Sequence, residues 1–219
     1  MTTNDPSATY RARLVEQIAR RSEPWPGERW DPRVLEAMRT VPRHAFVPGV
    51  SFSLAYDDMP QPIGNGQTIS QPTVVAMMTQ ALALDRNAKL LEIGTGSGYH
   101  AAVVSMLAKE VYTIEIHESL ATNARETLES LGYRNVHVRH GDGYAGWPEH
   151  APFDRILLTA APPTLPDTLV EQLAEGGILV APVGPAGGLQ QLVRYRKHGG
   201  KLAEEDLGAV MFVPMVRGE

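Results

Sequence analysis

The sequence of 219 residues contains no cysteine, and this absence excludes several kinds of site at once. Disulfide frameworks, thiolate metal sites and cysteine nucleophiles all require that residue. The histidines do not replace it as a metal centre, because no H-E-x-x-H motif occurs and His137 and His140 do not share one face of a strand. We therefore expect no metal site.

The chain also has little basic charge and no long apolar run. Its formal net charge is −5, whereas phosphate binding needs a clustered basic face, so we expect no nucleic-acid partner. The densest basic stretch, Arg194 to Lys201, is short, and we interpret it as a solvated hairpin. No window approaches the ~18 apolar residues of a membrane helix, and Met1 to Thr9 does not resemble a signal peptide. We expect a cytoplasmic protein without a membrane partner.

The first third of the chain has the pattern of helices joined by loops. Tyr10 to Arg21 carries apolar residues at helical spacing, and Ser22 to Trp30 is a connector rich in proline and tryptophan. Asp31-Pro32 is a good helix start, since aspartate caps and proline suits the first turn. Phe46 to Ile63 is irregular, with several prolines. We predict a helical, loop-rich lead-in over residues 1–71.

From residue 72 onward, apolar runs typical of strands alternate with helical patterns. The predicted helices span 72–84, 99–108, 118–131 and 166–174; the predicted strands span 89–93, 111–116, 136–139, 155–159 and 177–182, with further strands around a glycine turn in 190–215. Such alternation indicates βαβ units in a doubly wound α/β fold with a parallel sheet. We expect residues 72–219 to form the core of one structural unit.

A glycine loop, Gly94-Thr95-Gly96-Ser97-Gly98, follows the first strand of this core. Glycines allow a sharp turn and a close approach of ligand atoms to the backbone. Tyr99 stands where the dinucleotide fingerprint needs glycine or alanine, and no Lys-Ser/Thr follows as in a Walker loop. Glu115 ends the next strand about 20 residues later, the offset of a ribose-binding carboxylate. A cofactor loop of another type is indicated, with a purely structural turn as the alternative.

Three features together, Glu92-Ile93 before the loop, Glu115, and Gly141-Asp142-Gly143 after the third strand, resemble a class I S-adenosylmethionine-dependent methyltransferase. The resemblance implies a Rossmann-like, mostly parallel, seven-stranded sheet. It implies S-adenosyl-L-methionine as the cofactor, with S-adenosyl-L-homocysteine as its product, and places Asp142 near the adenine amino group. A cofactor that lacks a pyrophosphate does not need the third glycine, in agreement with Tyr99.

Further motifs follow one another between Asp31 and Pro214. They are Ala55-Tyr56-Asp57-Asp58, Pro62-Ile63-Gly64, Gly66-Gln67-Thr68-Ile69-Ser70-Gln71-Pro72, Gly146-Trp147-Pro148, Ala151-Pro152-Phe153-Asp154, Thr159-Ala160-Ala161 and Val213-Pro214-Met215. In this order they closely resemble the protein-L-isoaspartate O-methyltransferase family. The resemblance implies methylation of the α-carboxylate of L-isoaspartyl residues in damaged proteins or peptides, which leads to a succinimide and then to aspartate. Isoaspartyl proteins and peptides are the expected partners, and we expect a monomer.

The resemblance also carries over site residues. It assigns catalysis to Ser70, in a segment that lies over the reactive end of the cofactor in the family. The expected cofactor-binding residues are Gln67, Thr68, Ile69, Ser70, Glu92, Gly94, Thr95, Gly96, Ser97, Gly98, Glu115, Gly141, Asp142 and Gly143. The expected substrate-binding residues are Ile63, Thr68, Ser70, Val213 and Pro214.

The chemistry implied for this site needs little acid–base machinery. A substrate carboxylate is already ionised at neutral pH, so no strong base is required. A dry site that aligns oxygen, methyl and sulfur favours a transfer in which both charges vanish. We therefore interpret Ser70 as a hydrogen-bond donor that positions the carboxylate; the alternative is that it caps the helix that begins at Pro72.

The sequence leaves other functions open. One is an O-methyltransferase of the same fold that esterifies an aspartate in a dedicated peptide; others are a nicotinamide-dependent oxidoreductase and a cofactor-binding protein without turnover. The chain departs from the family at Thr73, where an aromatic residue is common, at His100, where glutamine is frequent, and in Trp25 to Trp30. We interpret Asp57-Asp58 as a turn or a gate beside the site rather than as paired acids.

Overall fold

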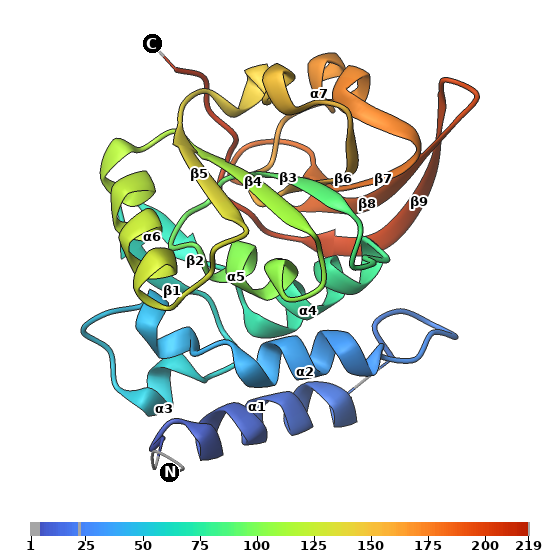
Figure 1. Cartoon of the computed structure of the whole chain (residues 1–219). Helices are drawn as coiled ribbons and strands as arrows, with labels where there is room; N and C mark the ends of the chain where they lie inside the picture. Colours follow the sequence, from blue (N-terminus) through green and yellow to red (C-terminus); the bar gives the residue numbers. More distant parts are fainter. Residues whose placement is uncertain (1–4, 22, 219) are drawn as a thin grey trace.

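The computed structural model describes residues 5–21 and 23–218. Three stretches lie outside these ranges: residues 1–4, at the start of the predicted lead-in, Ser22, at the start of the predicted connector, and residue 219, at the end of the predicted core. Within them, a seven-stranded sheet with the order β5-β4-β3-β6-β7-β8-β9 forms the centre of the molecule, and helices lie on both of its faces (Figure 1). The predicted doubly wound α/β architecture is confirmed.

Five strands of the sheet are parallel, and the last two are antiparallel. The strands are β3 (Lys89–Ile93), β4 (Glu110–Glu115), β5 (Val136–His140), β6 (Phe153–Leu158), β7 (Leu173–Val183), β8 (Gln190–His198) and β9 (Lys201–Val210). The order reverses at β3, since β4 and β5 lie on one side of it and β6 on the other. A reversal of this kind opens a crevice at the carboxyl ends of the strands.

Alternating side chains of β3 separate the two faces of the sheet. Leu90 packs with Met78 and Val104 in one buried cluster, whereas Leu91 packs with Leu169 in another. The helices that carry these partners are α4 (Pro72–Ala81), α5 (Tyr99–Ser105) and α7 (Asp167–Gln172); α6 (Glu118–Ser130) contacts β4 and β5. The core is therefore a three-layer arrangement built on buried, β-branched and leucine-rich strands.

The lead-in contains the helices that the sequence predicts and some regular structure that it does not. Its elements are α1 (Ala8–Arg21), α2 (Pro32–Thr40), η1 (Arg43–Phe46), α3 (Phe52–Ala55), β1 (Gln61–Gly64) and β2 (Gln67–Ile69). Asp31 caps α2 as expected, because its side chain accepts a hydrogen bond from the Arg33 N–H at 2.8 Å. The stretch from Phe46 to Ile63 is less irregular than predicted, since it holds α3 and the start of the β1–β2 hairpin.

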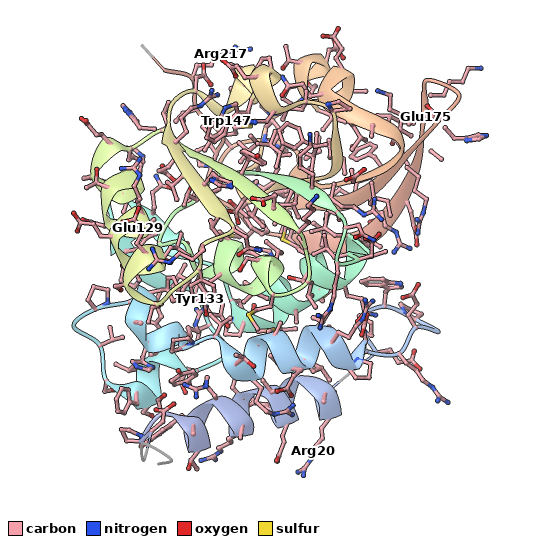
Figure 2. The ribbon with its side chains drawn as sticks, in the orientation of Figure 1. Arg20, Glu129, Tyr133, Trp147, Glu175 and Arg217 are labelled. Atoms are coloured by element: carbon pink, nitrogen blue, oxygen red, sulfur yellow. The ribbon has the colours of Figure 1, made fainter. Side chains whose placement is uncertain are left out.

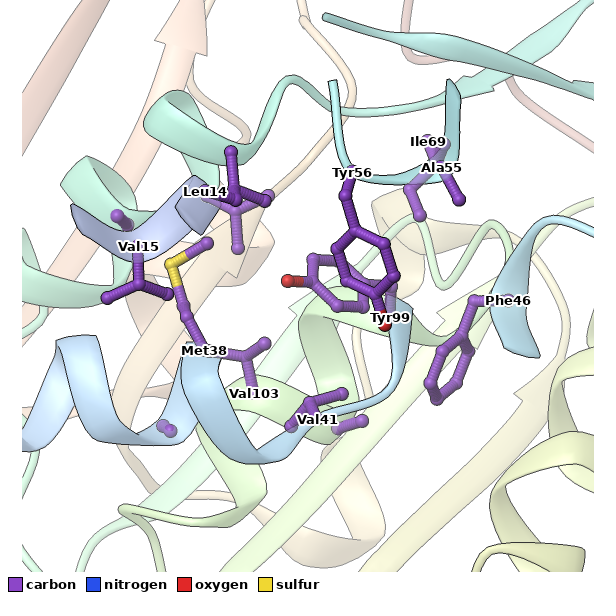
Figure 3. Packing of buried hydrophobic residues seen from close by; sticks show 14 of the residues in the cluster. Leu14, Val15, Met38, Val41, Phe46, Ala55, Tyr56, Ile69, Tyr99 and Val103 are labelled. Carbon is purple, nitrogen blue, oxygen red and sulfur yellow. The ribbon is translucent and has the colours of Figure 1, made fainter. Parts of the chain in front are cut away.

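One hydrophobic cluster joins the lead-in to the core (Figure 3). Val15 of α1 and Met38 of α2 are buried in it together with Ile69 of β2 and with Tyr99 and Val103 of α5. Each fully buried aliphatic side chain contributes about 1.5–3 kcal/mol relative to an exposed one. The lead-in is therefore fastened to α5, and this contact holds the β1–β2 hairpin beside the carboxyl edge of the sheet.

The basic stretch Arg194 to Lys201 forms the predicted β8–β9 hairpin, with Gly199-Gly200 at its turn. The prediction that the whole stretch is solvated was wrong for Arg194, whose side chain is buried. Arg194 donates from Nε to a carboxylate oxygen of Glu205 at 2.8 Å and lies over the ring of Trp25. Position 194 lies on the inward side of β8, and Trp25 of the connector covers it.

No helix within residues 5–21 and 23–218 has the length and apolar character needed to cross a membrane. The same part of the chain holds no group of three or more histidine, aspartate and glutamate side chains that could bind a metal ion.

Candidate active site

A cavity lies at the carboxyl ends of β3 and β4, at the point where the strand order reverses. It encloses about 790 Å³ of empty space, the open solvent at its mouth included. Its walls come from the β1–β2 hairpin, the glycine loop, the end of β4 and the C-terminal segment. The predicted site residues that line it are Gln67, Thr68, Ile69, Ser70, Gly94, Thr95, Gly96, Ser97, Glu115, Gly143, Val213 and Pro214. Segments far apart in sequence thus meet at one cavity.

Five predicted site residues do not line this cavity. Ile63 lies against the glycine loop, since a Cβ on Gly96 would be 3.3 Å from its Cδ1. Asp142 accepts a hydrogen bond from the Tyr144 N–H at 2.8 Å and caps a short 3₁₀ helix. The others lie beneath or beside the loops; they are Glu92, Gly98 and Gly141. Their roles toward ligands stay predictions.

The glycine loop is shaped by close contact with two neighbouring strand ends. Gly94 has φ +97°, and a Cβ there would lie 2.4 Å from the Oγ1 of Thr159, at the end of β6. Thr159 Oγ1 in turn donates to the carbonyl oxygen of Ile93 at 3.0 Å. On the other side, the Gly96 N–H donates to Glu115 Oε2 at 2.8 Å. Only glycine fits at position 94, so the loop conformation depends on contacts that the tertiary structure creates.

Backbone donors fix the direction of the Glu115 side chain at the end of β4. Its side chain is buried, and besides the Gly96 bond its Oε1 accepts from the His117 N–H at 3.0 Å. Each carboxylate oxygen has two lone pairs, so both can still accept a hydrogen bond from a ligand hydroxyl. The geometry suits the predicted role of a ribose acceptor.

Glu92 supports the loop from below through a chain of hydroxyl groups. Thr95 Oγ1 lies 2.7 Å from Thr113 Oγ1, which donates to Glu92 Oε2 at 2.5 Å. Burial raises the pKa of Glu92 to about 8, with a smaller contribution from the negative charge of Glu115; the Thr113 hydrogen bond acts in the opposite direction. A proton on Glu92 near neutral pH avoids two buried negative charges under the same loop.

The Glu92→Gln variant should flatten the dependence of stability on pH. The folded-state pKa, about 8, lies above the ordinary value of 4.5, so the folded chain retains a proton that the unfolded chain releases between these values. The free energy of unfolding therefore falls as pH rises through this window, by up to about 1.4 kcal/mol per unit. Glutamine does not titrate and removes this slope. Urea unfolding from pH 5 to 8 measures it.

The matched control is Glu129→Gln, on the exposed side of α6, where Figure 2 labels Glu129. This variant should keep the slope of the unaltered chain. An unchanged slope in Glu92→Gln would contradict the raised pKa.

The β1–β2 hairpin is attached to the start of α6, next to the glycine loop. Asn65 Nδ2 donates to Ser119 Oγ at 2.9 Å, and the side-chain amide of Gln67 lies 3.4 Å from His117 Nε2. These contacts bring the hairpin over the end of β4. The hairpin therefore closes one side of the cavity.

Ser70 is half-buried and is one of the residues that line the cavity, and the N-cap residue of α4 is Gln71. The helix is capped from elsewhere, because Asp58 accepts from the Thr73 N–H at 2.8 Å and from the Thr73 hydroxyl at 2.7 Å. Gln71, the cap residue, makes no side-chain capping bond but donates to Asp58 at 3.2 Å. The interpretation of Ser70 as the cap of α4 was wrong. Thr73 instead donates the two hydrogen bonds that Asp58 accepts at the start of this helix. Asp58, predicted to be part of a turn or gate, acts as the cap.

The C-terminal segment forms the wall opposite the hairpin. Val213 O accepts from the Ala161 N–H, and the Met215 N–H donates to Ala161 O, both at 2.8 Å. The C-terminal segment therefore pairs with the chain after β6 through one isolated β-bridge, between Ala161 and Pro214. The predicted continuation of strands to Met215 was wrong, since β9 ends at Val210. Arg217, labelled in Figure 2, lies over the ring of Tyr144 and holds the tail beyond the bridge.

Several cavity residues were not predicted from the sequence as site residues. They are Val75, Ile93, Tyr99, His100, Ile114, Ile116, His117, Thr159, Ala160, Met215 and Val216. Most are apolar residues that look like ordinary core, and only their place directly before or after a motif could have signalled them. His100, His117 and Thr159 are polar. Nε2 of His100 lies 3.0 Å from Thr79 Oγ1, and burial lowers the pKa of His100 to about 3, so its ring is neutral.

Comparison with known proteins agrees with this geometry. The family model of protein-L-isoaspartate(D-aspartate) O-methyltransferase matches residues 26–219, which include every wall of the cavity. The chain belongs to this family. Members of the protein-L-isoaspartate O-methyltransferase family from Synechococcus sp. (strain JA-2-3B'a(2-13)) and Opitutus terrae are 53% and 58% identical to it. The alignments cover 97% and 85% of this chain, and 88% and 80% of the two relatives.

Solved structures of the O-methyltransferase family share the fold. One protein-L-isoaspartate O-methyltransferase superposes with a TM-score of 0.83 at 27% identity, over 93% of this chain and 65% of its own length. A Plasmodium falciparum member, solved in complex with S-adenosyl-L-homocysteine, has a TM-score of 0.78 at 25% identity and covers 94% of this chain and 98% of its own. The predicted class I methyltransferase fold is thereby confirmed.

Proposed function

We propose that this chain transfers a methyl group from S-adenosyl-L-methionine to the α-carboxylate of L-isoaspartyl residues in damaged proteins or peptides. The resulting ester is readily displaced by the next backbone amide, which gives a succinimide that opens to aspartate. The observation that carries the proposal is that Ser70 and the glycine loop line one cavity in a chain of this family. Family membership supports the substrate class, and the cavity supports the cofactor.

The residues present fit the cofactor. When bound, S-adenosyl-L-methionine supplies an electrophilic sulfonium methyl group. Gly94 and Gly96 let the loop backbone approach Thr159 and Ile63, where a Cβ would collide or crowd, and Glu115 offers carboxylate lone pairs for ribose hydroxyls. Ile114 and Ile116 add an apolar surface on either side of Glu115 for the nucleoside. We propose that the predicted cofactor-binding residues that line the cavity hold it.

Ser70 has the properties of a positioning donor. Its hydroxyl is uncharged, so no counter-ion is needed beside it. Ile69 and Val75 are buried apolar side chains that line the same cavity and leave water few partners there. A hydroxyl that holds the substrate carboxylate in line with the methyl group lowers the entropic part of the barrier. In a site depleted of water, loss of charge during transfer is favourable. We propose this role for Ser70.

We propose that the substrate lies between the hairpin and the C-terminal segment. Thr68, Ser70, Val213 and Pro214 line the cavity from these two sides, and Ile63 lies beside them on the hairpin. The mouth between two backbone segments suits an extended peptide whose isoaspartyl linkage enters it.

We further propose that residues 1–71 and 72–219 act as one unit, as a monomer in the cytoplasm. The shared hydrophobic cluster of α1, α2, β2 and α5 supports the first point. Each cavity wall comes from this one chain, which supports the second. The absence of cysteine fits a reducing compartment.

An assay with paired peptides tests the function. The purified chain, S-adenosyl-L-methionine labelled in its methyl group, and either an isoaspartyl peptide or its aspartyl counterpart are incubated, and ester formation is counted. We expect methylation of the isoaspartyl peptide at a rate at least 100-fold above that of the aspartyl peptide, since the two carboxylates differ in position along the backbone. Equal methylation of both, or of neither, would refute the repair function; activity confined to one aspartyl peptide would favour a dedicated substrate.

A further inference from the structure

Arg43 is a large, fully buried side chain in η1, in the lead-in and outside the cavity. The hydrogen bonds of its Nε and Nη2 go to main-chain carbonyl oxygens, whereas its buried Nη1 has no hydrogen-bond partner among the described residues. Nε donates to Ala55 O and Nη2 donates to Ser70 O, both at 2.9 Å, with a longer contact to Met59 O at 3.5 Å. A guanidinium taken out of water is costly unless it is well hydrogen-bonded. The buried guanidinium of Arg43 therefore fixes the positions of the Ala55 and Ser70 carbonyls.

The same guanidinium also contacts the helix that follows the glycine loop. Its central carbon lies 4.8 Å from the centroid of the Tyr99 ring, and Tyr99 is buried between Arg43 and the cavity that it lines. Ala55, Ile69 and Tyr99 belong to one hydrophobic cluster (Figure 3). Arg43 thus joins three segments: the end of α3, the catalytic hairpin segment at Ser70, and the start of α5 on the cofactor side.

A fixed Ser70 carbonyl restrains the backbone at this residue, and with it the position of the Ser70 Cβ. The carbonyl and the side chain leave the same Cα, so a peptide plane held by a charged donor restricts where the hydroxyl can point. Charge-assisted hydrogen bonds in a dry environment are stronger than neutral ones, and a rigid fork loses little further entropy. A shift of about 1 Å at a positioning group is enough to lower a rate by about 100-fold.

We propose that Arg43 is a positioning residue for methyl transfer, which acts through the backbone of Ser70. It does not touch the substrate or the cofactor. Its guanidinium holds the Ser70 carbonyl relative to Tyr99, and thereby aligns the Ser70 hydroxyl with the glycine loop. This inference rests on the proposed function, and it adds a requirement that lies in the lead-in.

Arg155 provides a matched structural arginine. It donates from Nε to Leu82 O at 2.6 Å and from Nη2 to Ala83 O at 3.1 Å, beyond the C-terminal end of α4 and away from Ser70. Burial lowers the pKa of Arg155 from its ordinary value, as it does for Arg43. A purely structural role predicts that loss of either arginine lowers stability alone.

The test compares Arg43→Met, Arg43→Lys and Arg155→Met in the full chain. The melting temperature is measured for each variant. The kcat and KM for an isoaspartyl peptide and the Kd of S-adenosyl-L-homocysteine are then measured at a temperature below the lowest melting temperature. We expect Arg43→Met to lower kcat at least tenfold with less than a threefold change in Kd, and Arg43→Lys to recover part of kcat, because an ammonium can still reach the Ser70 carbonyl. Arg155→Met should lower the melting temperature and keep kcat within twofold.

Three outcomes would overturn the inference. They are an unchanged kcat in folded Arg43→Met, an equal loss of kcat in Arg155→Met, and a loss of cofactor affinity that matches the loss of kcat. If Arg43→Met does not fold, Arg43→Gln takes its place, since glutamine lacks the charge and the reach of the guanidinium; a folded glutamine variant with unaltered kcat would overturn the inference. The unaltered chain is assayed first, so failure of the proposed function would appear there and not in the variants.

Discussion

The Ser70→Ala variant should lower kcat for an isoaspartyl peptide by about 100-fold, because loss of one aligned hydrogen-bond donor typically costs 10²–10³ in rate. Ser70 lines the cavity, and Asp58 rather than Ser70 caps α4, so the variant should fold normally. The Kd of S-adenosyl-L-homocysteine, measured by calorimetry, should change less than threefold. Steady-state kinetics with the labelled cofactor measures the loss of kcat.

Ser53→Ala is the matched control, since Ser53 is an exposed serine on α3. It should behave as the unaltered chain. A Ser70→Ala variant with normal kcat would remove Ser70 from the reaction. A variant that instead loses affinity for the cofactor product would make Ser70 a cofactor ligand and not a donor to the substrate carboxylate.

The Gly94→Ala variant should abolish most cofactor binding and lower the free energy of unfolding by about 1–3 kcal/mol. The new Cβ would lie 2.4 Å from Thr159 Oγ1, and Gly94 has φ +97°, which an L side chain rarely adopts. The loop must move, and it lines the cavity beside Glu115. We expect the Kd of S-adenosyl-L-homocysteine to rise at least tenfold in calorimetry, with urea unfolding as the measure of stability.

Gly132→Ala separates the two causes of that effect. Gly132 has φ +84° but nothing within 4 Å of the new Cβ, and it lies at the end of α6. It should show the cost of the backbone conformation without the collision, and leave the cofactor affinity unaltered. If both variants lose the same stability and neither loses affinity, the contact between Gly94 and Thr159 does not shape the site.

Most of the sheet and its order of helices could be predicted because the relevant signals are local. β3 spans Lys89–Ile93 as predicted, and Asp31-Pro32 begins α2 as its capping chemistry requires. Helix ends were less accurate; α4 stops at Ala81 and α5 at Ser105, a few residues before the predicted ends. Tertiary contacts decide such ends, because the last turn of a helix is held weakly by its own hydrogen bonds.

The candidate site, like the fold, contains some residues that sequence motifs indicate and others that only long-range contacts place. Ser70, Glu115 and the glycine loop stand in recognisable motifs, so their placement in one cavity could be expected. Arg43 could not be found, because an arginine is usually exposed and nothing in its neighbours indicates burial. Asp58 likewise caps a helix that begins 14 residues later, a contact that no local capping pattern contains.

The sequence by itself determined the class of the fold and the motifs around the cavity, because strand periodicity, glycine spacing and capping depend on residues near one another in the chain. The tertiary structure decided how those motifs are held: which donors fix Glu115, which residue caps α4, and which buried cation holds the Ser70 carbonyl. These are contacts between residues far apart in sequence. Each depends on distance and direction in space, and a linear pattern contains neither.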